Sequence, residues 1–367
     1  MTDSNWQPAP SLPPPAATVG WIGWVRANLI SSFSNSVLTV VLGVAIIYYG
    51  WQILDWALFS ADFAGVDQKD CESSGACWVF IRSRLDFFIY GFYPNAEIWR
   101  INVMFGLLAV LIIPHFFEGF KHKKLFGWLL ITAFPVVSGI LLLGGILGLE
   151  PVETDKWGGL ALTLVLAFVG IVAALPLGIL LALGRRSDMP IIRGICVCFI
   201  ELWRGVPLIS VLFMASVMLP LFLPEGVNFN KLLRALIGIT MFQSAYMAEV
   251  VRGGLQAIPK GQYEAAAALG LGYWKSMRLI ILPQALKLVI PGIVNTFIGL
   301  FKDTTLVLII GLFEVLQTMN TSITDPAWSN VAVEGYVFAG AVFWVFCYAM
   351  SKYSQALERK LHTGHKR

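Results

Sequence analysis

The chain has 367 residues, of which 57% are apolar and only 13% are charged, and its formal net charge is +4. Soluble domains carry about a quarter of charged residues, so this composition excludes a soluble globular protein. The length has room for about eight spans of about 20 residues with their loops. Apolar runs of this length in a lipid bilayer are helical, because a helix satisfies its own backbone hydrogen bonds. The prediction is an all-α, polytopic membrane protein with about eight transmembrane helices, and the mild positive charge indicates membrane topology and no nucleic-acid partner.

The first 35 residues predict a disordered cytoplasmic tail. Five prolines fall between positions 8 and 15 and prevent a regular helix there. No basic start followed by an apolar core and a small-residue cleavage site is present, so the apolar run 37–54 is expected to be an uncleaved membrane anchor. Residues 36–150 are predicted to form an amino-terminal extension with three transmembrane helices.

Residues 55–99 are acidic on balance and predict a loop on the outer, periplasmic side of the membrane. Cys71 and Cys77 lie six positions apart in this loop. An oxidising periplasm allows them to form a disulfide. The alternative is two unpaired thiols, and the sequence leaves the two possibilities open.

Basic residues mark the cytoplasmic side of the remaining spans. Lys121, Lys123 and Lys124 follow the second span, and Arg185 and Arg186 follow the fourth. The spans after the first are predicted at 101–117, 125–149, 160–183, a fifth ending near 223, 232–248, 289–301 and 333–350. This count places both termini in the cytoplasm, with a basic tail over 356–367.

The loop 253–287 is the longest polar interruption in the second half of the chain. Glu264 is followed by four alanines, which favour a helix with almost no side-chain bulk. Gly270 and Gly272 are expected to break this helix, and Pro283 follows its restart. Two short helices at an angle, the first nearly bare, form a shape that the groove of another protein can close on.

The spacing of this loop carries a resemblance to a known family. Glu-Ala-Ala, three residues, Gly, nine residues, Ile, one residue and Leu-Pro is similar to the cytoplasmic loop of permease subunits of bacterial ABC importers. The fixed positions are filled by Glu264, Ala265, Ala266, Gly270, Ile280, Leu282 and Pro283. The resemblance implies a type I importer core over 155–355, in which these residues form coupling helices seated in a cleft of the ATP-hydrolysing subunit.

Three further segments resemble permeases for polar amino acids. These are 199–210, where Val206 replaces the usual Thr, the continuous run 245–283, and 302–306, where Thr305 replaces Ser. The extended amino-terminal part resembles the permeases of broad-specificity L-amino-acid importers of Gram-negative bacteria. The resemblance implies an inner-membrane location, a dimer of ATP-binding subunits, a second homologous permease subunit in a heterodimer, and a periplasmic binding protein that delivers L-amino acids.

Polar side chains within the apolar segments supply the candidate site. Glu201 and Arg204 are three residues apart on one helix face and are predicted to form a structural ion pair. Intramembrane or near-membrane polar groups that could contact a zwitterionic solute are Gln243, Glu249, Lys302, Asp303 and Thr304. A broken helix that lines the path would explain the last three, and mutual neutralisation of Lys302 and Asp303 is the alternative.

Several chemistries are excluded by missing motifs. No Gly-x-x-x-x-Gly-Lys-Ser/Thr occurs, so ATP with Mg²⁺ is expected in a partner ATPase, and this chain is expected to bind no cofactor and not to be an enzyme. The five cysteines lack metal-ligand spacing and the four histidines have no clustered partners, so no metal site is predicted. The alternative function is a stand-alone secondary transporter, which would contain paired repeats of broken helices, whereas the coupling loop occurs once.

Overall fold

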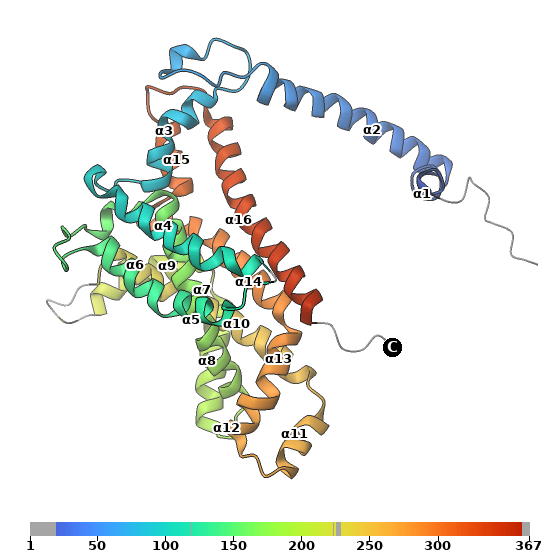
Figure 1. The fold of residues 1–367 in the computed structure, drawn as a ribbon, viewed down its shortest axis with the longest axis vertical. Helices are drawn as coiled ribbons and strands as arrows, with labels where there is room; N and C mark the ends of the chain where they lie inside the picture. The colour runs from blue at the N-terminus through green and yellow to red at the C-terminus, as the bar shows by residue number, and fades with distance from the viewer. Residues whose placement is uncertain (1–19, 118, 223, 225–228, 362–367) are drawn as a thin grey trace, which may run out of the picture. The chain divides into compact units, whose positions relative to one another are not determined.

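The computed structural model describes residues 20–117, 119–222, 224 and 229–361, and these are almost entirely helical (Figure 1). The chain divides into two compact units, residues 1–79 and 80–367. Five helices are long and apolar enough to cross a membrane, and two further helix pairs, bent by 42° and 104°, bring the number to seven if each pair is one span. The predicted helical membrane fold is confirmed.

The first unit is built around one long apolar helix. After α1 (Gly20–Asn28), α2 (Phe33–Leu54) continues through a π-helical turn at Asp55–Phe59, and none of its side chains is buried. A helix that is apolar on all sides is suited to lipid as its solvent. The predicted disordered tail is wrong for residues 20–28, because the prolines end at position 15 and the following residues can form a helix; residues 1–19 lie outside the described part.

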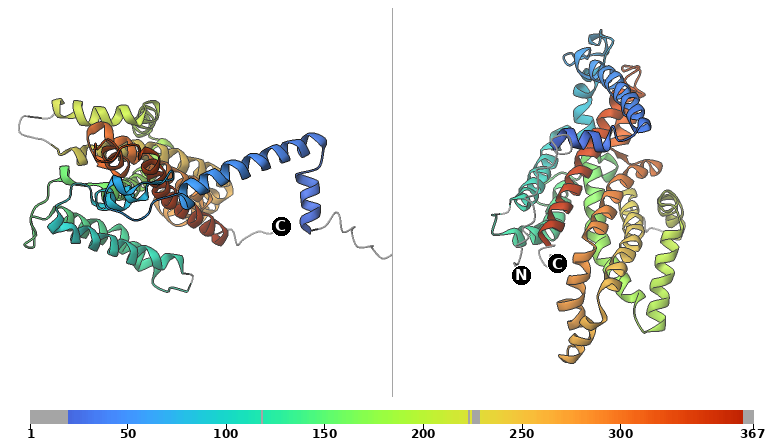
Figure 2. Two further views of the ribbon diagram at one scale, coloured as in Figure 1. Left: turned by 90° about the horizontal axis from the view of Figure 1, so that it is seen from above. Right: turned by 90° about the vertical axis from the view of Figure 1, so that its right-hand side faces the viewer.

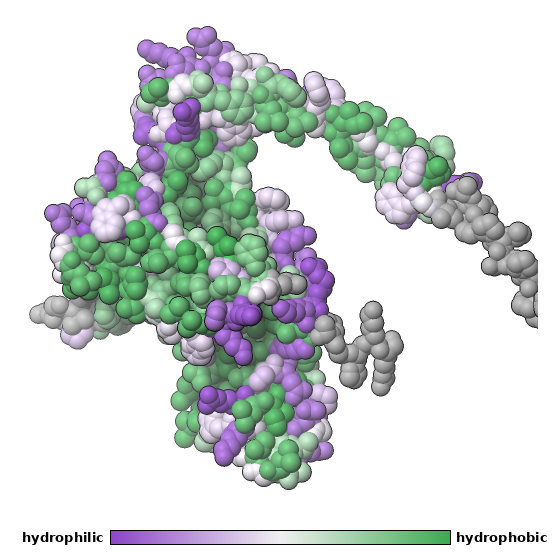
Figure 3. Space-filling view, viewed as in Figure 1, coloured by the Kyte–Doolittle hydropathy of each residue, from purple (hydrophilic) through white to green (hydrophobic). Residues whose placement is uncertain are grey.

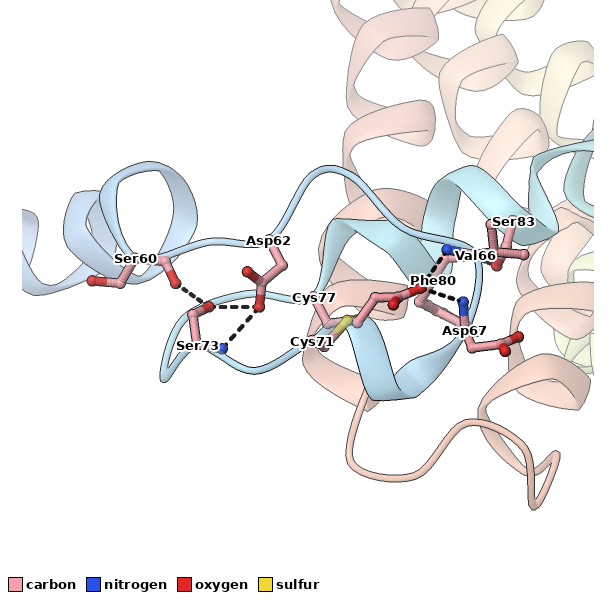
Figure 4. Close-up of a disulfide and its surroundings, with 10 residues drawn as sticks. Ser60, Asp62, Val66, Asp67, Cys71, Ser73, Cys77, Phe80 and Ser83 are labelled. Carbon is pink, nitrogen blue, oxygen red and sulfur yellow. Dashed lines mark hydrogen bonds between the residues drawn. A yellow bond between two sulfur atoms is a disulfide. The ribbon is translucent and has the colours of Figure 1, made fainter.

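The loop after α2 is held by local bonds and a disulfide. Cys71 and Cys77 are joined by a disulfide, with Cα atoms 5.6 Å apart (Figure 4). The hydroxyl and backbone N–H of Ser73 donate to the Asp62 carboxylate at 2.7 and 3.0 Å. Backbone N–H groups of residues 67 and 66 donate to the Asp70 carboxylate and lower its pKa. These bonds give the exposed loop a defined conformation.

The second unit contains the remaining helices and one short strand. Its elements are α3 (Trp78–Tyr90, which begins at the unit boundary), α4 (Ile98–Ile112), α5 (Lys123–Ile131), α6 (Ala133–Leu143), α7 (Gly159–Arg185), α8 (Pro190–Gly205), α9 (Leu208–Phe213), α10 (Lys231–Ala257), α11 (Lys260–Ala268), α12 (Tyr273–Ser276), α13 (Leu282–Leu288), α14 (Ile290–Asp303), β1 (Phe313–Glu314), α15 (Val315–Ile323) and α16 (Ala332–Leu361). Apolar side chains cover α4, α5 and α6 in Figure 3, as lipid contact requires.

The predicted count of eight spans differs from the structure at one helix. The predicted span 232–248 lies in α10, which has 27 residues but is not among the helices apolar enough to pass as a span. Fourteen residues of α10 are buried, including Arg234, Gln243 and Ser244. A helix surrounded by other helices does not face lipid, so it can carry polar side chains that a lipid-exposed span cannot.

Helix α10 packs along α7 through the centre of the second unit. The two backbones approach closely at Gly178, where an added Cβ atom would lie 2.6 Å from Cβ of Met247. Small residues allow such close contact between helices in membranes. One buried apolar cluster joins α4, α6, α7, α9, α10 and α14, and a second joins the ends of α7, α8 and α10 to α13. Residues of the predicted coupling loop pack into the second cluster.

Two helix breaks interrupt the apolar segments. The chain bends by 104° between α8 and α9, where Val206 and Pro207 are extended. Helix α14 changes at Thr304 into a 3₁₀-helix that ends at Gly311, a residue with φ of +75°. Thr304 at the second break is fully buried, so protein neighbours can satisfy the backbone groups that the break frees.

Glu314 connects β1 to the start of α15. Its side chain is fully buried and accepts from the backbone N–H groups of Leu316 and Gln317, both at 2.8 Å. The strand residue itself forms a parallel bridge with Gly159 at the start of α7. Burial raises the pKa of the Glu314 carboxyl from its usual 4.5 to about 7, and the two N–H donors only partly offset this rise.

This pKa predicts a pH dependence of stability. Between pH 4.5 and 7 the folded protein binds more protons than the unfolded chain, so its stability falls as the pH rises. At about 1.4 kcal/mol for each pH unit, wild type is expected to lose about 3 kcal/mol across this range relative to Glu314→Gln. Thermal unfolding in detergent at a series of pH values measures the difference. Glu150→Gln, at an exposed position, is the control and is expected to follow wild type; identical profiles for wild type and Glu314→Gln would contradict the prediction.

Candidate functional site

The predicted coupling loop forms an elbow at one end of the second unit (Figures 1 and 2). Helix α11 ends at Ala268, and α12 begins at Tyr273. Gly270 between them has φ of +70°, and an added Cβ atom would meet nothing within 4 Å. Gly272 is extended and precedes α12. The break lies at the two glycines named from the sequence, because only the backbone of glycine adopts the left-handed conformation at low cost.

The signature residues divide into an outward and an inward set. Glu264, Ala265, Gly270 and Pro283 are exposed, whereas Ala266 is buried, and Ile280 and Leu282 are half-buried against the second apolar cluster. The large apolar side chains Leu269, Trp274 and Leu279 are 75%, 68% and 66% exposed. In Figure 3 this end of the molecule mixes hydrophobic and hydrophilic side chains, in contrast to the more uniform green over α4–α6. Exposed apolar side chains within a polar surface are typical of a protein-binding surface.

Two side-chain contacts hold the elbow against the rest of the protein. The Tyr263 hydroxyl donates to the backbone oxygen of Leu255 and accepts from Arg186, both at 3.1 Å. The Gln284 amide donates to the side-chain oxygen of Gln262 at 3.1 Å and thereby connects α13 to α11. Sequence analysis did not identify these residues. Tyr263 directly precedes Glu264, the first residue of the signature, and this position could have drawn attention to it. The sequence does not indicate which residues its hydroxyl contacts.

Tyr263→Phe is expected to loosen α11 without removing it. The ring and its contact with Arg186 remain, whereas both hydroxyl hydrogen bonds are lost, at a cost of about 1 kcal/mol each. Hydrogen exchange of the α11 backbone should accelerate by about thirtyfold, since the two bonds together contribute about 2 kcal/mol and about 1.4 kcal/mol corresponds to tenfold. Tyr273→Phe is the control, because this ring is half-exposed and forms no hydrogen bond with the described residues. Equal exchange in both variants would exclude the proposed role of the hydroxyl.

A charge cluster joins the C-terminal parts of α7, α8 and α10. The carboxylate of Glu249 accepts from Arg252 at 2.8 and 2.9 Å and forms an ion pair with Arg185 at 2.9 Å. Arg204 lies 4.0 Å from the same carboxylate, and Arg185 also contacts Glu201 at 2.9 Å. The predicted pair between Glu201 and Arg204 is wrong, because the packing of three helices offers each of them a partner on another element.

Two predicted path residues come together across 60 positions of sequence. The Gln243 amide of α10 donates to the Asp303 carboxylate of α14 at 2.9 Å, and Gln243 is buried. No ion pair within 4.0 Å joins Asp303 to Lys302, although both residues are described. Thr304 is fully buried and donates back to the Phe301 backbone oxygen at 2.7 Å. Glu249 does not belong to this group, because its carboxylate is surrounded by arginines in the charge cluster.

The described residues contain no group of three or more His, Cys, Asp or Glu side chains that could hold a metal ion. An exposed elbow is connected through α13 and α10 to the buried pair between Gln243 and Asp303.

Comparisons with known proteins agree with this arrangement. A family model described as the binding-protein-dependent transport system inner membrane component matches residues 174–363. The inner membrane amino-acid ABC transporter permease protein YhdY of Escherichia coli (strain K12) is 55% identical, over 93% of each chain. The glutamate/glutamine/aspartate/asparagine transport system permease protein BztC of Rhodobacter capsulatus is 41% identical, over 96% of each chain.

Shorter relatives match about half of the chain. The glutamate/aspartate import permease protein GltK of Escherichia coli O157:H7 is 32% identical over 55% of this chain and 91% of its own length. A solved structure of an amino acid ABC transporter with histidines is 31% identical, with a TM-score of 0.48, over 55% of this chain and 92% of that chain. The chain therefore belongs to the family of inner membrane components of binding-protein-dependent transport systems.

Proposed function

We propose that the chain is the membrane-spanning permease subunit of an ATP-driven importer of L-amino acids. As a member of its family it is a transport subunit, and ATP hydrolysis belongs to a separate subunit. The observation that carries the proposal is the exposed elbow between α11 and α12, which presents apolar side chains and the outward signature residues. The names of both full-length relatives support amino acids as the solute class.

The chain is proposed to consist of an extension over 36–150 and a core over 155–355, with tails at residues 1–35 and 356–367. The shorter relatives support this division, because they cover 55% of this chain while matching most of their own length. Both termini are proposed to be cytoplasmic, since this places the basic loops and the elbow on the inner side. The protein itself is a multi-pass inner membrane protein.

The proposed partners supply ATP hydrolysis, the other half of the translocation path and delivery of the solute. A dimer of ATP-binding subunits, with ATP and Mg²⁺, receives the elbow in its cleft. A second homologous permease subunit completes the translocation path, and a periplasmic binding protein delivers the solute. Helices α10 to α14 are proposed to have two packings. Nucleotide and the loaded binding protein each bind one packing more tightly than the other, and this difference in affinity shifts the protein between them.

The solute path is proposed to pass the buried pair of α10 and α14. Asp303 offers a carboxylate to the ammonium group of an amino acid, and Gln243 fixes its orientation through the hydrogen bond at 2.9 Å. Lys302 and Thr304 are proposed to lie beside this path at the helix break. Glu249 is proposed to act through the charge cluster and not by contact with solute.

Asp303→Asn is expected to reduce amino-acid uptake by about tenfold or more, because a neutral amide attracts an ammonium group much less and about 1.4 kcal/mol corresponds to that factor. Uptake of a labelled amino acid into cells that contain the whole importer measures the effect. Asp325→Asn is the control, because it also removes a carboxylate, one that follows α15 and pairs with Arg84. Uptake that survives Asp303→Asn unchanged would remove this residue from the substrate role and leave the rest of the proposal standing.

Co-purification and reconstitution test the proposal as a whole. The full-length chain is expected to purify with an ATP-binding subunit and a second permease, and proteoliposomes with these subunits should take up amino acids only with ATP and the binding protein. Active uptake by this chain alone on an ion gradient would replace the proposal with a secondary transporter, the alternative class.

A further inference from the structure

A cavity of about 330 Å³ lies between the proposed extension and the proposed core, within the second unit. Side chains of α4 and α6 line one side, and side chains of α7 and α10 line the other. The lining includes Met104, Leu142, Leu164, Val165 and Leu236. Its volume falls within the range of about 300–1,000 Å³ that is usual for small-ligand pockets. An apolar cavity of this size in a membrane protein is suited to a hydrocarbon chain.

Two residues that line this apolar cavity each carry a buried hydrogen-bond donor without a partner among the described residues. The Ser138 hydroxyl and the indole N–H of Trp157 form no hydrogen bond within the described residues. Both residues are only 7% exposed. An indole N–H can donate but not accept, and a buried polar group without a partner is costly. An acceptor oxygen next to the apolar part of an occupant would satisfy these donors.

A second, polar cavity of about 600 Å³ adjoins the first and shares Leu143, Thr154 and Asn230 with it. Its lining contains two acids and two bases: Glu153, Asp155, Lys231 and Arg234. All four are described, and no ion pair within 4.0 Å joins any two of them. Arg234 is 8% exposed, and its Nε atom has no partner although another nitrogen donates to Ser216. This charge pattern complements a zwitterion that carries one phosphate and one ammonium group.

We propose that the two cavities together bind one zwitterionic glycerophospholipid with a primary ammonium headgroup, of the phosphatidylethanolamine type. An acyl chain fills the apolar cavity, and an ester carbonyl oxygen accepts from Ser138 and Trp157. The phosphate contacts the two bases of the polar cavity, and the ammonium group contacts its two acids. A free amino acid shares the zwitterionic chemistry but would leave the apolar cavity and both donors unused. The bound lipid fills the space between the extension and the core.

Filling the apolar cavity tests the acyl-chain part of the site. Gly139 lies in α6 and lines the cavity, and a Cβ atom added there would meet nothing within 4 Å. The full-length protein is purified in mild detergent from membranes that contain phosphatidylethanolamine and phosphatidylglycerol, and native mass spectrometry counts the retained lipids. Wild type should retain one phosphatidylethanolamine per chain. Gly139→Phe should retain about tenfold less, which corresponds to about 1.4 kcal/mol of lost affinity.

Gly106→Phe is the matched control. Gly106 lies in α4 and is exposed, an added Cβ atom there also meets nothing within 4 Å, and the residue does not line the cavity. This variant should retain lipid as wild type does. Wild type without a retained lipid, or equal retention in the two phenylalanine variants, would overturn the proposal.

The headgroup part is tested at exposed positions outside the apolar cavity. The double variant Glu153→Gln with Asp155→Asn removes the partners of the ammonium group and the repulsion of an anionic headgroup. The ratio of retained phosphatidylethanolamine to phosphatidylglycerol should fall by about tenfold. An unchanged ratio, or a wild type that retains phosphatidylglycerol in preference, would overturn the assignment of the headgroup. This arm does not depend on the folding of the phenylalanine variants, because both acids are exposed.

Discussion

Gly270→Asp is expected to reduce ATP-dependent uptake strongly while the protein still assembles in the membrane. The residue has φ of +70°, a conformation in which most side chains are strained by about 1–2 kcal/mol and in which aspartate, like asparagine, is strained less. A carboxylate at the elbow also places a charge against the proposed cleft of the ATP-binding subunit, which is expected to contact the exposed apolar side chains. Uptake should fall by about tenfold or more, since about 1.4 kcal/mol of lost coupling energy corresponds to tenfold.

Gly148→Asp is a closely matched control. Gly148 is exposed, has φ of +76°, and leaves open space for a Cβ atom, but it lies in the connection between α6 and α7. Gly270→Asn separates the two effects, because asparagine tolerates the left-handed conformation and adds no charge. We expect Gly270→Asn and Glu264→Lys to give intermediate losses. Normal uptake with Gly270→Asp, or an equal loss with Gly148→Asp, would remove the elbow from the coupling mechanism.

Glu249→Gln is expected to destabilise the protein by about 2 kcal/mol, because three arginines lose the carboxylate that they surround. A fully buried pair loses about 3–5 kcal/mol when one partner is removed, and partial exposure reduces this cost. The Glu249 side chain is 15% exposed, whereas the side chains of its arginine partners are 23% to 36% exposed. Thermal unfolding of the detergent-solubilised protein measures the loss, which salt should reduce only weakly.

Glu201→Gln removes the same charge from a side chain that is 55% exposed and is expected to cost less than about 1 kcal/mol. Adding Arg252→Gln to Glu249→Gln should recover part of the loss, because it removes one of the uncompensated guanidinium groups. Equal destabilisation by Glu249→Gln and Glu201→Gln would show that the cluster is not centred on Glu249.

The features that sequence analysis predicted correctly are those encoded over short stretches. The break at Gly270 and Gly272 follows from the conformational freedom of glycine, and the change of helix type at Thr304 coincides with polar residues in an apolar run. The apolar spans are local as well, since their length and hydropathy do not depend on neighbours. Helix α10 does not meet the hydropathy criterion for a span. It packs among other helices, so it can carry polar side chains that a span in contact with lipid cannot.

Side-chain pairing could not be predicted in the same way. Glu201 and Arg204 are neighbours on one helix face, and local spacing alone favours their pairing. Arg185 and Glu249 reach them from α7 and α10 only after the three helices have packed. The partners of Tyr263 likewise come from elements that the sequence places elsewhere.

The amino-acid sequence alone is enough to identify a helical membrane protein of the importer permease family with a glycine elbow in its polar loop. Hydropathy, glycine conformation and motif spacing are properties of short segments, and they need no knowledge of the packing. Only the tertiary structure decided that Gln243 meets Asp303, that Glu249 lies among arginines, and that two cavities adjoin between the proposed extension and the proposed core. These contacts join residues far apart in the chain, and their energies depend on distances that are set when the helices pack together.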